Sequence, residues 1–503
     1  MHRFLTKEAA AHLGEKVKVA GWVSVRRAHG KIVFIDLRDI SGVLQCVFIP
    51  SNKAAYDVVQ DVRSEWVVEL IGQIVKRPEN MINDTLLTGT VELSVEELKV
   101  LSRAKTLPFA VDTDGMEINE EIRMKYRYLD LRRERMKHNL IVRHNVVKFI
   151  RDFLSAEHFT EIETPMLTKS TPEGARDFVV PSRLHPGKFY ALPQSPQQYK
   201  QLLMVAGLER YFQIARAMRD EDLRGDRQPE HTQLDMEMSF IERDDFLELF
   251  ERMLVAMVKA VFPEKTIQEI PFPRISYKDA MEKYQSDKPD LRKDKNDPNL
   301  LAFCWIVDFP FFEKTEEGGW TFVHNPFSAP KPEFLPDLLG KKNIGGIVAN
   351  QYDIAMNGWE LGSGGIRNNT PEAIEAVFEV MGYSKEEINE KFGHMIEAYK
   401  YGAPSHGGIG FGVDRLIALL MGEPNIREVI AFPKTGDGRD LMMQAPSELY
   451  PKQLKELHLH PVVSRKAQVS PKTKLFNVVK VERQSGKIAI KKVTINHSKK
   501  KKK

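Results

Sequence analysis

Apolar and polar residues alternate in short runs along the first hundred residues of the chain. A two-residue period of this kind is typical of half-buried strands, and it occurs in VKVAGWVSV, KIVFIDLRD, GVLQCVFI, EWVVELIGQIV and TVELSVEELKVL. Glycine turns separate the runs, and the segment AAYDVVQDVRSEW predicts one helix between them. Short strands in this arrangement predict a small five-stranded barrel.

From Arg123 onward the apolar residues are spaced as they are in helices. The segment RMKYRYLDLRRERMKHNLIVRHNVVKFIRDFLSAEHF predicts long helical sequence that enters a mixed α+β domain. Further along, the pattern predicts a strand over residues 212–218, a polar, turn-rich loop, and an alternating strand over residues 234–240. The run VDRLIALLM predicts a helix that begins near Arg415. We therefore expect an α+β fold.

These patterns divide the 503 residues into four segments: a barrel at residues 1–103, a linker at 104–122, an α+β domain at 123–462 and a C-terminal extension at 463–503. No run of about 18 apolar residues occurs, so we expect a soluble, cytoplasmic protein with no membrane partner. Cys46 and Cys304 are the two cysteines of the chain, and we expect both to be reduced core residues.

Charge is distributed unevenly between the body of the chain and its end. Residues 463–503 contain 14 Lys and Arg and one acidic residue, which gives +13 and leaves −9 on the remainder of a chain whose net charge is +4. A tail this basic can bind a polyanion by releasing counterions. Within it, KLFNVVKV and KIAIKKVTI flank a turn-like ERQSG, which predicts a basic β-hairpin or, without a bound polyanion, a disordered end.

Two arginines stand in settings suited to a nucleotide. Arg219 follows the strand predicted at 212–218, and Arg415 follows the glycines of GGIGFGVDRLIALLMG, where the backbone can approach a ligand closely. A planar guanidinium makes two parallel hydrogen bonds to a phosphate, so the pair predicts a clamp for a triphosphate. The segment GGIGFG lacks the GxGxxG spacing of a dinucleotide-binding fold, and no Walker A sequence occurs.

The segments around both arginines resemble motifs 2 and 3 of the class II aminoacyl-tRNA synthetases. The stretches RYLDLRRERM, ETPMLTKSTPEGARDFVVPSR, KFYALPQSPQQYKQLLM and IREVIAFPKT extend the resemblance to bacterial-type aspartyl-tRNA synthetases from about Gly21 to Leu457. The HIGH and KMSKS signatures of class I synthetases do not occur. The resemblance implies an N-terminal OB-fold, a catalytic domain built on a mainly antiparallel sheet, and ATP-dependent ligation of L-aspartate to tRNA through an aspartyl-adenylate.

The resemblance also implies site residues. Those for ATP binding and catalysis are Arg219, Glu221, His231, Glu360 and Arg415, with Arg219 on the α-phosphate and Arg415 on the γ-phosphate. Those for aspartate are Glu173, Ser195, Gln197, Lys200, Gln233, Asp235, His324 and Arg367. The implied Mg²⁺ ligands are Asp353 and Glu360, whose oxygens suit a hard cation. The implied anticodon contacts are Arg26, Arg27, His29, Phe34, Gln45 and Asn80, since single-stranded RNA is bound by aromatic faces and cations.

Lys200 and Arg367 are the residues that favour aspartate over asparagine. Two cations around one buried subsite demand an anion, because an uncompensated buried charge is costly. A neutral isostere would leave their polar groups unpaired and would be rejected.

Three departures from the family pattern stand out. His231 in PEHTQ replaces a common phenylalanine that stacks on adenine, so we expect stacking with an altered pH dependence. Asn325 in VHNPF replaces a common second histidine. After SDKPDLR, where relatives carry an insertion of more than a hundred residues, Arg292 is followed within a dozen residues by the strand-like LAFCWIVDFPFFE.

The resemblance predicts a homodimer, because FTEIETPML, with Pro165, resembles the interface motif of the family. His29 is typical of members that also charge the asparagine tRNA, whereas Asn80 fits neither pattern; we expect aspartyl-tRNA(Asn) as a second product, completed by an amidotransferase partner. The alternatives are an asparaginyl or lysyl class II relative and a catalytically inactive RNA-binding paralogue.

Overall fold

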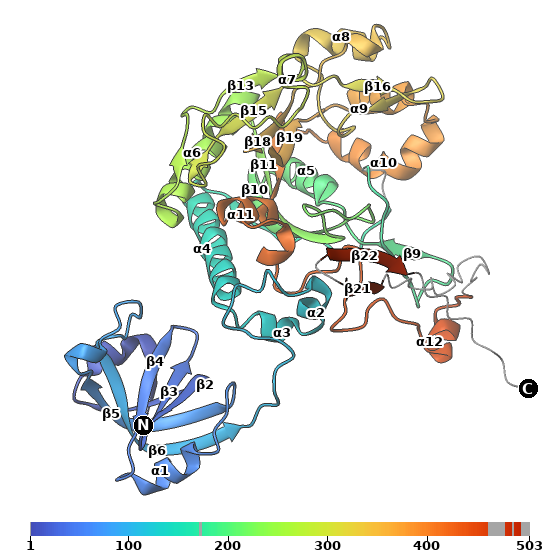
Figure 1. Cartoon of the computed structure of the whole chain (residues 1–503). Coiled ribbons are helices and arrows are strands. Elements are labelled where there is room, and N and C mark those ends of the chain that lie inside the picture. Colours follow the sequence, from blue (N-terminus) through green and yellow to red (C-terminus); the bar gives the residue numbers. More distant parts are fainter. Residues whose placement is uncertain (1, 171–173, 461–477, 485–486, 494–503) are drawn as a thin grey trace, which may run out of the picture. The chain divides into compact units, whose positions relative to one another are not determined.

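The computed structural model describes residues 2–170 and 174–460 and the backbone strands at 478–484 and 487–493 (Figure 1). The contacts divide the chain into two units, residues 1–180 with 189–447 and residues 181–188 with 448–503. Both cysteines are free and buried, as predicted.

Five strands and one helix form the N-terminal part of the first unit. The strands are β2 (Lys16–His29), β3 (Ile32–Arg38), β4 (Val43–Phe48), β5 (Val67–Lys76) and β6 (Val91–Ser102), and the helix is α1 (Lys53–Val59). Pairing runs from β1 (Arg3–Phe4) through β2, β3, β4, β6 and β5 in one six-stranded sheet, and β5 also pairs with β2. Its alternating apolar residues pack inside, among them Val19, Ile35 and Leu70.

The larger part of the first unit is built on an eight-stranded sheet. In order across the sheet the strands are β13 (Arg274–Ser276), β15 (Phe303–Val307), β18 (Gln351–Met356), β19 (Trp359–Ile366), β20 (His406–Gly412), β11 (Glu230–Ser239), β10 (Arg210–Met218) and β7 (Thr160–Glu161). Only the two outermost pairs, β13–β15 and β10–β7, are parallel, which confirms the prediction of a mainly antiparallel sheet.

Strand β11 shows why this sheet has one apolar and one polar face. Leu234, Met236 and Met238 belong to the main hydrophobic core together with residues of α4 (Glu134–Ala156), α6 (Arg243–Val261) and α11 (Val413–Leu420). Because successive side chains of a strand point to opposite faces, Gln233, Asp235 and Glu237 lie on the other face, where they are buried as well. A row of buried polar groups on a sheet face requires partners, and the candidate site supplies them.

The remaining helices of the first unit are α2 (Glu120–Lys125), α3 (Arg127–Asp130), α5 (Gln197–Val205), α7 (Tyr277–Tyr284), α8 (Leu335–Leu339), α9 (Pro371–Val380) and α10 (Lys385–Tyr399). Short strands complete it: β1 (Arg3–Phe4), β12 (Thr266–Ile267), β14 (Leu300–Leu301), β16 (Phe312–Lys314), β17 (Trp320–Phe322), and β9 (Phe189–Ala191), which pairs with β8 (Val179–Pro181). The 3₁₀ turns are η1 (Thr6–His12), η2 (Glu79–Met81), η3 (Pro332–Phe334), η4 (Ile344–Gly346) and η5 (Ile426–Val429).

Three predicted elements differ from the structure. The helix predicted over AAYDVVQDVRSEW ends at Val59, about halfway along that segment. The helical stretch from Arg123 is broken into α2, α3 and α4, with extended backbone at Arg133, because the buried Asp130 gathers the surrounding arginines. Phe240 lies beyond β11, exposed and with a positive φ of 59°, so the strand ends one residue earlier than its alternation suggests.

The second unit contains α12 (Pro451–Glu456) and two strands near the C-terminus. These strands, β21 (Val478–Gln484) and β22 (Lys487–Val493), lie in the two segments predicted to form a hairpin and pair antiparallel.

Candidate active site

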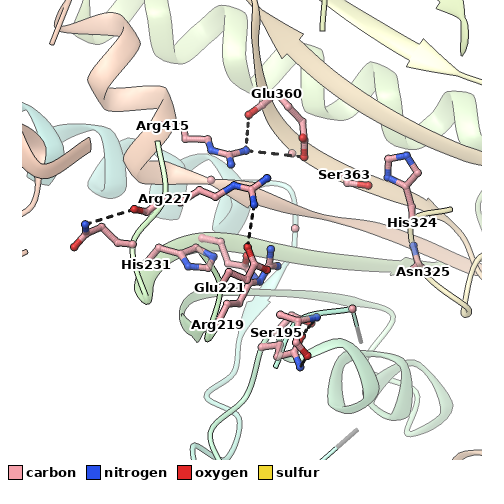
Figure 2. Close-up of a pocket in the computed structure, with 18 of the residues that line it drawn as sticks. Ser195, Arg219, Glu221, Arg227, His231, His324, Asn325, Glu360, Ser363 and Arg415 are labelled. Atoms are coloured by element: carbon pink, nitrogen blue, oxygen red, sulfur yellow. Dashed lines mark hydrogen bonds and ion pairs between the residues drawn. The ribbon is translucent and has the colours of Figure 1, made fainter. Parts of the chain in front are cut away.

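A pocket of about 880 Å³ opens on the polar face of the sheet (Figure 2). It brings together eleven of the residues predicted from sequence: Ser195, Gln197, Arg219, Glu221, His231, Gln233, Asp235, His324, Glu360, Arg367 and Arg415. Lys200 and Asp353 lie beneath its surface, both buried. Glu173 lies outside the described residues, although its neighbour Gly174 lines the pocket.

Arg219 lies at the start of the loop that joins β10 to β11. Its backbone nitrogen donates to the carbonyl oxygen of Pro229 at 2.8 Å, which closes the base of the loop. Within the loop, Glu221 pairs with Arg227 at 3.2 Å. The guanidinium of Arg219 makes no ion pair with any residue that the structure describes, so it is available to an anion in the pocket.

Arg415, in the first turn of α11, joins three parts of the pocket wall. Its Nη1 donates to the carbonyl oxygen of Glu360 at 2.9 Å and lies 4.0 Å from that residue's Oε1 (Figure 2). Its Nη2 lies 3.2 Å from Oδ2 of Asp226, in the β10–β11 loop. Arg415 and Arg219 therefore line the same pocket, as the predicted clamp requires.

A buried network of two cations and two carboxylates forms the other end of the pocket. Lys200 Nζ lies 3.0 Å from Asp235 and 3.3 Å from Glu237, and Arg367 Nε lies 2.9 Å from Glu237. Although burial raises the pKa of Glu237, the charges of Arg367 and Lys200 lower it below its ordinary value. The premise that the two cations lack protein partners is therefore wrong, because two buried carboxylates already balance them.

Glu237 is the residue that sequence reasoning missed. The signal was present, since Gln233, Asp235 and Glu237 alternate with apolar residues in QLDMEMS and must share one face of the strand. Lys200 donates to Asp235 and to the carbonyl oxygens of Met236 and Ile409, so its donors are occupied. Arg367 uses Nε and Nη2 for Glu237 and Gly408, which leaves Nη1 without a partner among the described residues, on a side chain that lines the pocket.

The two predicted metal ligands lie on adjacent strands. Asp353 is in β18 and Glu360 in β19, and His324 Nδ1 lies 3.7 Å from Asp353 Oδ2. Burial, together with Glu360, raises the pKa of Asp353 to about 6 despite the opposing effect of His324. Its Oδ1 is buried without a hydrogen-bond partner.

The described part of the chain has no group of three or more His, Cys, Asp or Glu residues that could hold a metal. Mg²⁺ in proteins is commonly bound by one or two carboxylates together with substrate phosphates and water. Asp353, whose Oδ1 has no hydrogen-bond partner, and the neighbouring carboxylate of Glu360 fit this pattern.

His231 and Asn325, the two substitutions among the departures from the family pattern, have distinct surroundings. Burial and the charges of Arg219 and Arg415 lower the pKa of His231 to about 3. The ring is therefore neutral near neutral pH, and an effect of its titration on activity falls far below that range. Asn325 Oδ1 accepts hydrogen bonds from the backbone nitrogens of Phe327 and Ser328 at 3.0 and 3.1 Å, so Asn325 shapes a turn beside His324.

The predicted anticodon residues do not all share one face of the barrel. Phe34 lies opposite Arg27 in the β2–β3 register, and Arg27 pairs with Asp36 at 2.8 Å and donates to Gln45 at 3.2 Å. Arg26 instead donates to the carbonyl oxygen of Val59 and to Gln60 at the end of α1.

His29 and Asn80 are exposed, at the end of β2 and in η2. The structure thus brings Arg27, Phe34 and Gln45 together and separates Arg26 from them.

Two family models match the chain. The OB-fold nucleic acid binding domain matches residues 17–101, and the model described as tRNA synthetases class II (D, K and N) matches residues 119–436. The chain belongs to the class II tRNA synthetases. Across the residues described, no helix of this synthetase combines the length and apolar character that a membrane span needs.

Curated relatives align with nearly their whole length. The aspartate--tRNA(Asp/Asn) ligase of Dictyoglomus turgidum is 43% identical, with 90% of this synthetase and 97% of the relative covered. The ligase of the same name from Rubrobacter xylanophilus is 41% identical, with 90% and 95% covered. The first alignment runs over 577 positions, more than the 503 residues of this synthetase, so the relative carries segments that this synthetase lacks.

Solved structures share the fold of this synthetase. Asparaginyl-tRNA synthetase from Pyrococcus horikoshii, complexed with asparaginyl-adenylate, has a TM-score of 0.71 at 21% identity and covers 90% of this chain and 100% of its own. Aspartyl-tRNA synthetase from Entamoeba histolytica has a TM-score of 0.67 at 20% identity, with 86% and 91% covered.

Proposed function

We propose that the protein ligates L-aspartate to tRNA, using ATP and Mg²⁺ and passing through an aspartyl-adenylate. The observation that carries the proposal is one pocket that joins two opposed arginines to a buried Lys200–Asp235–Glu237–Arg367 network, in a chain whose curated relatives are named aspartate--tRNA(Asp/Asn) ligase. The arginines supply a site for phosphates, and the network supplies a site for a small charged substrate.

In the first step the α-carboxylate of aspartate attacks the α-phosphorus of ATP, and the bond to pyrophosphate breaks. Arg219, which has no ion-pair partner in the described part of the chain, binds the α-phosphate and stabilises its developing charge. Arg415 exchanges its contact with Asp226 for the γ-phosphate. Asp353 and Glu360 would hold Mg²⁺, which when bound neutralises phosphate charge. A terminal hydroxyl of tRNA then attacks the adenylate carbonyl, and AMP leaves.

Preference for aspartate rests on Arg367 rather than on unpaired cations. Its Nη1 is a donor without a partner among the described residues, and a side-chain carboxylate accepts from a guanidinium more strongly than a neutral amide does. Asp235 and Gln233, joined at 2.6 Å, offer carboxylate and amide groups to the substrate's ammonium end. Ser195, Gln197 and His324 line the same space, and Gln197 Nε2 is buried without a hydrogen-bond partner.

Amino-acid-dependent exchange of labelled pyrophosphate into ATP tests the proposal. We expect exchange with aspartate and none with asparagine or lysine. Exchange with asparagine or lysine alone would assign the enzyme to another substrate, and exchange with none of the three would favour an RNA-binding protein without catalysis.

The phosphate role of Arg219 predicts a specific loss of exchange. Arg219→Ala should lower the exchange rate by about 10²–10³-fold, because it removes a group that stabilises transition-state charge. Its unfolding temperature should stay unchanged, since the guanidinium holds no other part of the described chain. The matched control is Arg216→Ala, which removes a nearby arginine of β10 that pairs with Glu230 outside the pocket. Near wild-type exchange by Arg219→Ala would refute the assignment.

The tRNA partners proposed are those for aspartate and for asparagine, with an amidotransferase to complete the second product. Support comes from the exposed His29 at the end of β2 and from the dual name of the curated relatives. Charging each purified tRNA with labelled aspartate decides the point, since reaction with the aspartate tRNA alone would exclude the second product.

We also propose a cytoplasmic homodimer, on the likeness of the segment around Pro165 to the interface motif; sedimentation of the purified protein tests the dimer.

A further inference from the structure

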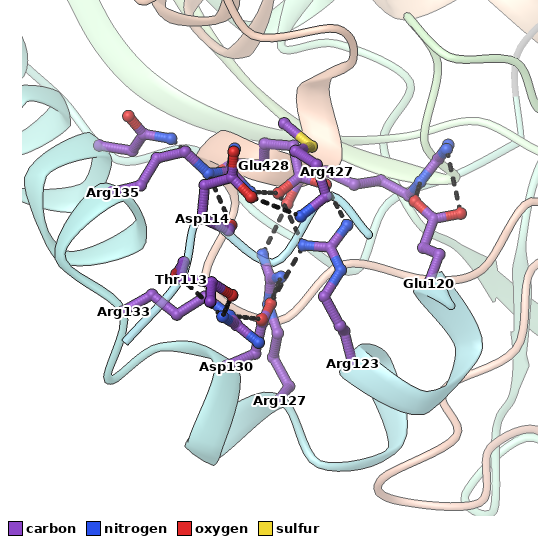
Figure 3. Close-up of polar contacts among 12 residues, drawn as sticks. Thr113, Asp114, Glu120, Arg123, Arg127, Asp130, Arg133, Arg135, Arg427 and Glu428 are labelled. Carbon is purple, nitrogen blue, oxygen red and sulfur yellow. Dashed lines mark hydrogen bonds and ion pairs between the residues drawn. The ribbon is translucent and has the colours of Figure 1, made fainter. Parts of the chain in front are cut away.

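A cluster of arginines and carboxylates joins α2, α3 and α4 to η5 (Figure 3), and Ile426 of η5 lines the active-site pocket. The carboxylate–arginine cluster consists of Asp130, Glu428, Glu423 and Glu120 with Arg123, Arg127, Arg133, Arg135 and Arg427. The fully buried Asp130 accepts from Arg127 and Arg133, both at 2.7 Å. Glu428, also buried, accepts from Arg123 and Arg135, both at 2.8 Å.

Burying the charges of this cluster costs folding free energy. Burying ion pairs costs several kcal/mol of desolvation per ion, and well-packed apolar residues often stabilise a fold as well or better. Burial raises the pKa of Glu428, but the hydrogen bonds and charges of Arg123 and Arg135 lower it to about 2, so the pairs remain charged. Arg123 Nε and Arg133 Nη2 are nevertheless buried without partners. Fixed geometry, rather than stability alone, accounts for retaining such a group.

One arginine of the cluster holds a backbone segment in place. Arg127 donates to the carbonyl oxygens of Arg427, Ile430 and Ala431 at 2.7, 2.8 and 2.9 Å. A single rigid guanidinium therefore fixes three peptide groups of the segment that contains η5. At the outer edge, Glu120 accepts from Arg427 Nε at 2.6 Å (Figure 3).

One residue before Arg427, the segment that Arg127 holds lines the pocket, at the end where we propose that phosphates bind. Ile426 lines the pocket next to Arg427, and its backbone nitrogen donates to the carbonyl oxygen of Gly225 at 3.1 Å. Asp226, the next residue, pairs with Arg415. A continuous chain of contacts thus runs from the cluster through η5 and the β10–β11 loop to Arg415.

We infer that the carboxylate–arginine cluster sets the position of the β10–β11 loop and of Arg415 for the triphosphate, with Arg127 and Glu120 as positioning residues. The inference rests on the proposed use of ATP but not on which amino acid is activated. We expect aspartate binding to be unaffected, because the described contacts of Lys200 and Arg367 are with Asp235, Glu237 and backbone carbonyls rather than with this chain of residues.

Glu120→Gln and Glu121→Gln form a matched pair for the test. Both glutamates begin α2, but Glu120 pairs with Arg427, whereas Glu121 pairs with the exposed Arg439. In the full-length protein, Glu120→Gln should weaken binding of Mg²⁺ with a non-hydrolysable ATP analogue by about threefold, as expected for a partly exposed ion pair. Glu121→Gln should bind the analogue like the wild type.

Arg127→Lys gives a stronger variant, because it keeps the charge beside Asp130 but cannot hold three carbonyls. We expect its KM for ATP to rise by about tenfold while its KM for aspartate stays the same. Equal rises in both KM values, or unchanged analogue binding in Glu120→Gln, would overturn the inference. If Arg127→Lys fails to fold, the Glu120 and Glu121 pair still decides. Analogue binding needs no aminoacylation, so failure of the proposed function would not be mistaken for failure of this inference.

Discussion

At the scale of single residues, the most informative side chain is Glu237, which converts two substrate-facing cations into a balanced network. The resemblance to class II synthetases implied Asp235, Lys200 and Arg367, but the sequence could not tell which charges neutralise one another, because Lys200 and Arg367 come from segments far apart in the chain. Only the fold brings α5, β11 and the end of β19 together. Which charges balance one another therefore depends on the tertiary structure, whereas the identity of the charged residues is given by the sequence.

The network predicts different outcomes for two substitutions of Arg367. Arg367→Leu should destabilise the fold by about 3–5 kcal/mol, because it removes the main partner of a fully buried carboxylate. Arg367→Lys should keep most of the stability but raise the KM for aspartate by about tenfold, since it loses the open guanidinium donor. Thermal unfolding and exchange kinetics measure the two effects. Should the KM for ATP rise equally in Arg367→Lys, Arg367 would have a structural role only.

The low pKa of His231 predicts that titration of this residue has no effect on activity near neutral pH. The imidazole takes up its proton only as the pH falls towards about 3, so the ring is neutral throughout the range about pH 6 to 8. His231→Phe should therefore leave the shape of the pH profile of kcat/KM for ATP unchanged in that range, whatever its effect on the absolute rate. An inflection present in the wild type and missing from the variant would contradict the low pKa.

At the scale of elements, the strands and the helix at Arg415 could be predicted from the local spacing of apolar residues, whereas the breaks and turns could not. The strands β10 and β11 and the helix α11 lie where the apolar spacing predicts them. The division of the stretch from Arg123 into α2, α3 and α4 was missed because it depends on Asp130 gathering arginines in the interior. Likewise, Arg26 and Arg27 are neighbours in sequence, but the strand directs them to different partners.

The turn at Asn325 carries a prediction at this scale. Asn325→Ala removes the oxygen that accepts from two backbone nitrogens and should cost about 1–2 kcal/mol of stability, while Asn325→Asp keeps an acceptor and should cost less. Because the turn lies beside His324, the alanine variant should also weaken aspartate binding. Denaturant unfolding and exchange kinetics of both variants test this, and equal stabilities would show that the turn does not need the side chain.

At the scale of the whole molecule, this chain has a basic tail and lacks segments that a curated relative carries. The tail carries +13, and the alignment with the relative extends over 577 positions against 503 residues here. We propose that this polycation supplies tRNA affinity by releasing counterions.

Deleting the residues after Pro461 should weaken tRNA binding and flatten its dependence on salt, because fewer counterions are released. The slope of log affinity against log salt should become shallower in proportion to the number of phosphates that the shortened protein no longer neutralises. Aspartate-dependent exchange should be unaffected. As a control, replacing only the five terminal lysines with serine separates their contribution from that of the hairpin strands β21 and β22. An unchanged slope after the full deletion would remove this role from the tail.

Both thiols of this chain are sealed in the interior. Burial raises the pKa of Cys46 far above its ordinary value and that of Cys304 to about 12, and the sequence contains no other cysteine. Since thiolates rather than thiols react with alkylating reagents, the native protein should be nearly inert to maleimides. A cysteine introduced at the exposed His29 would therefore be the single labelling position, and a fluorophore there would report directly on RNA approaching the end of β2.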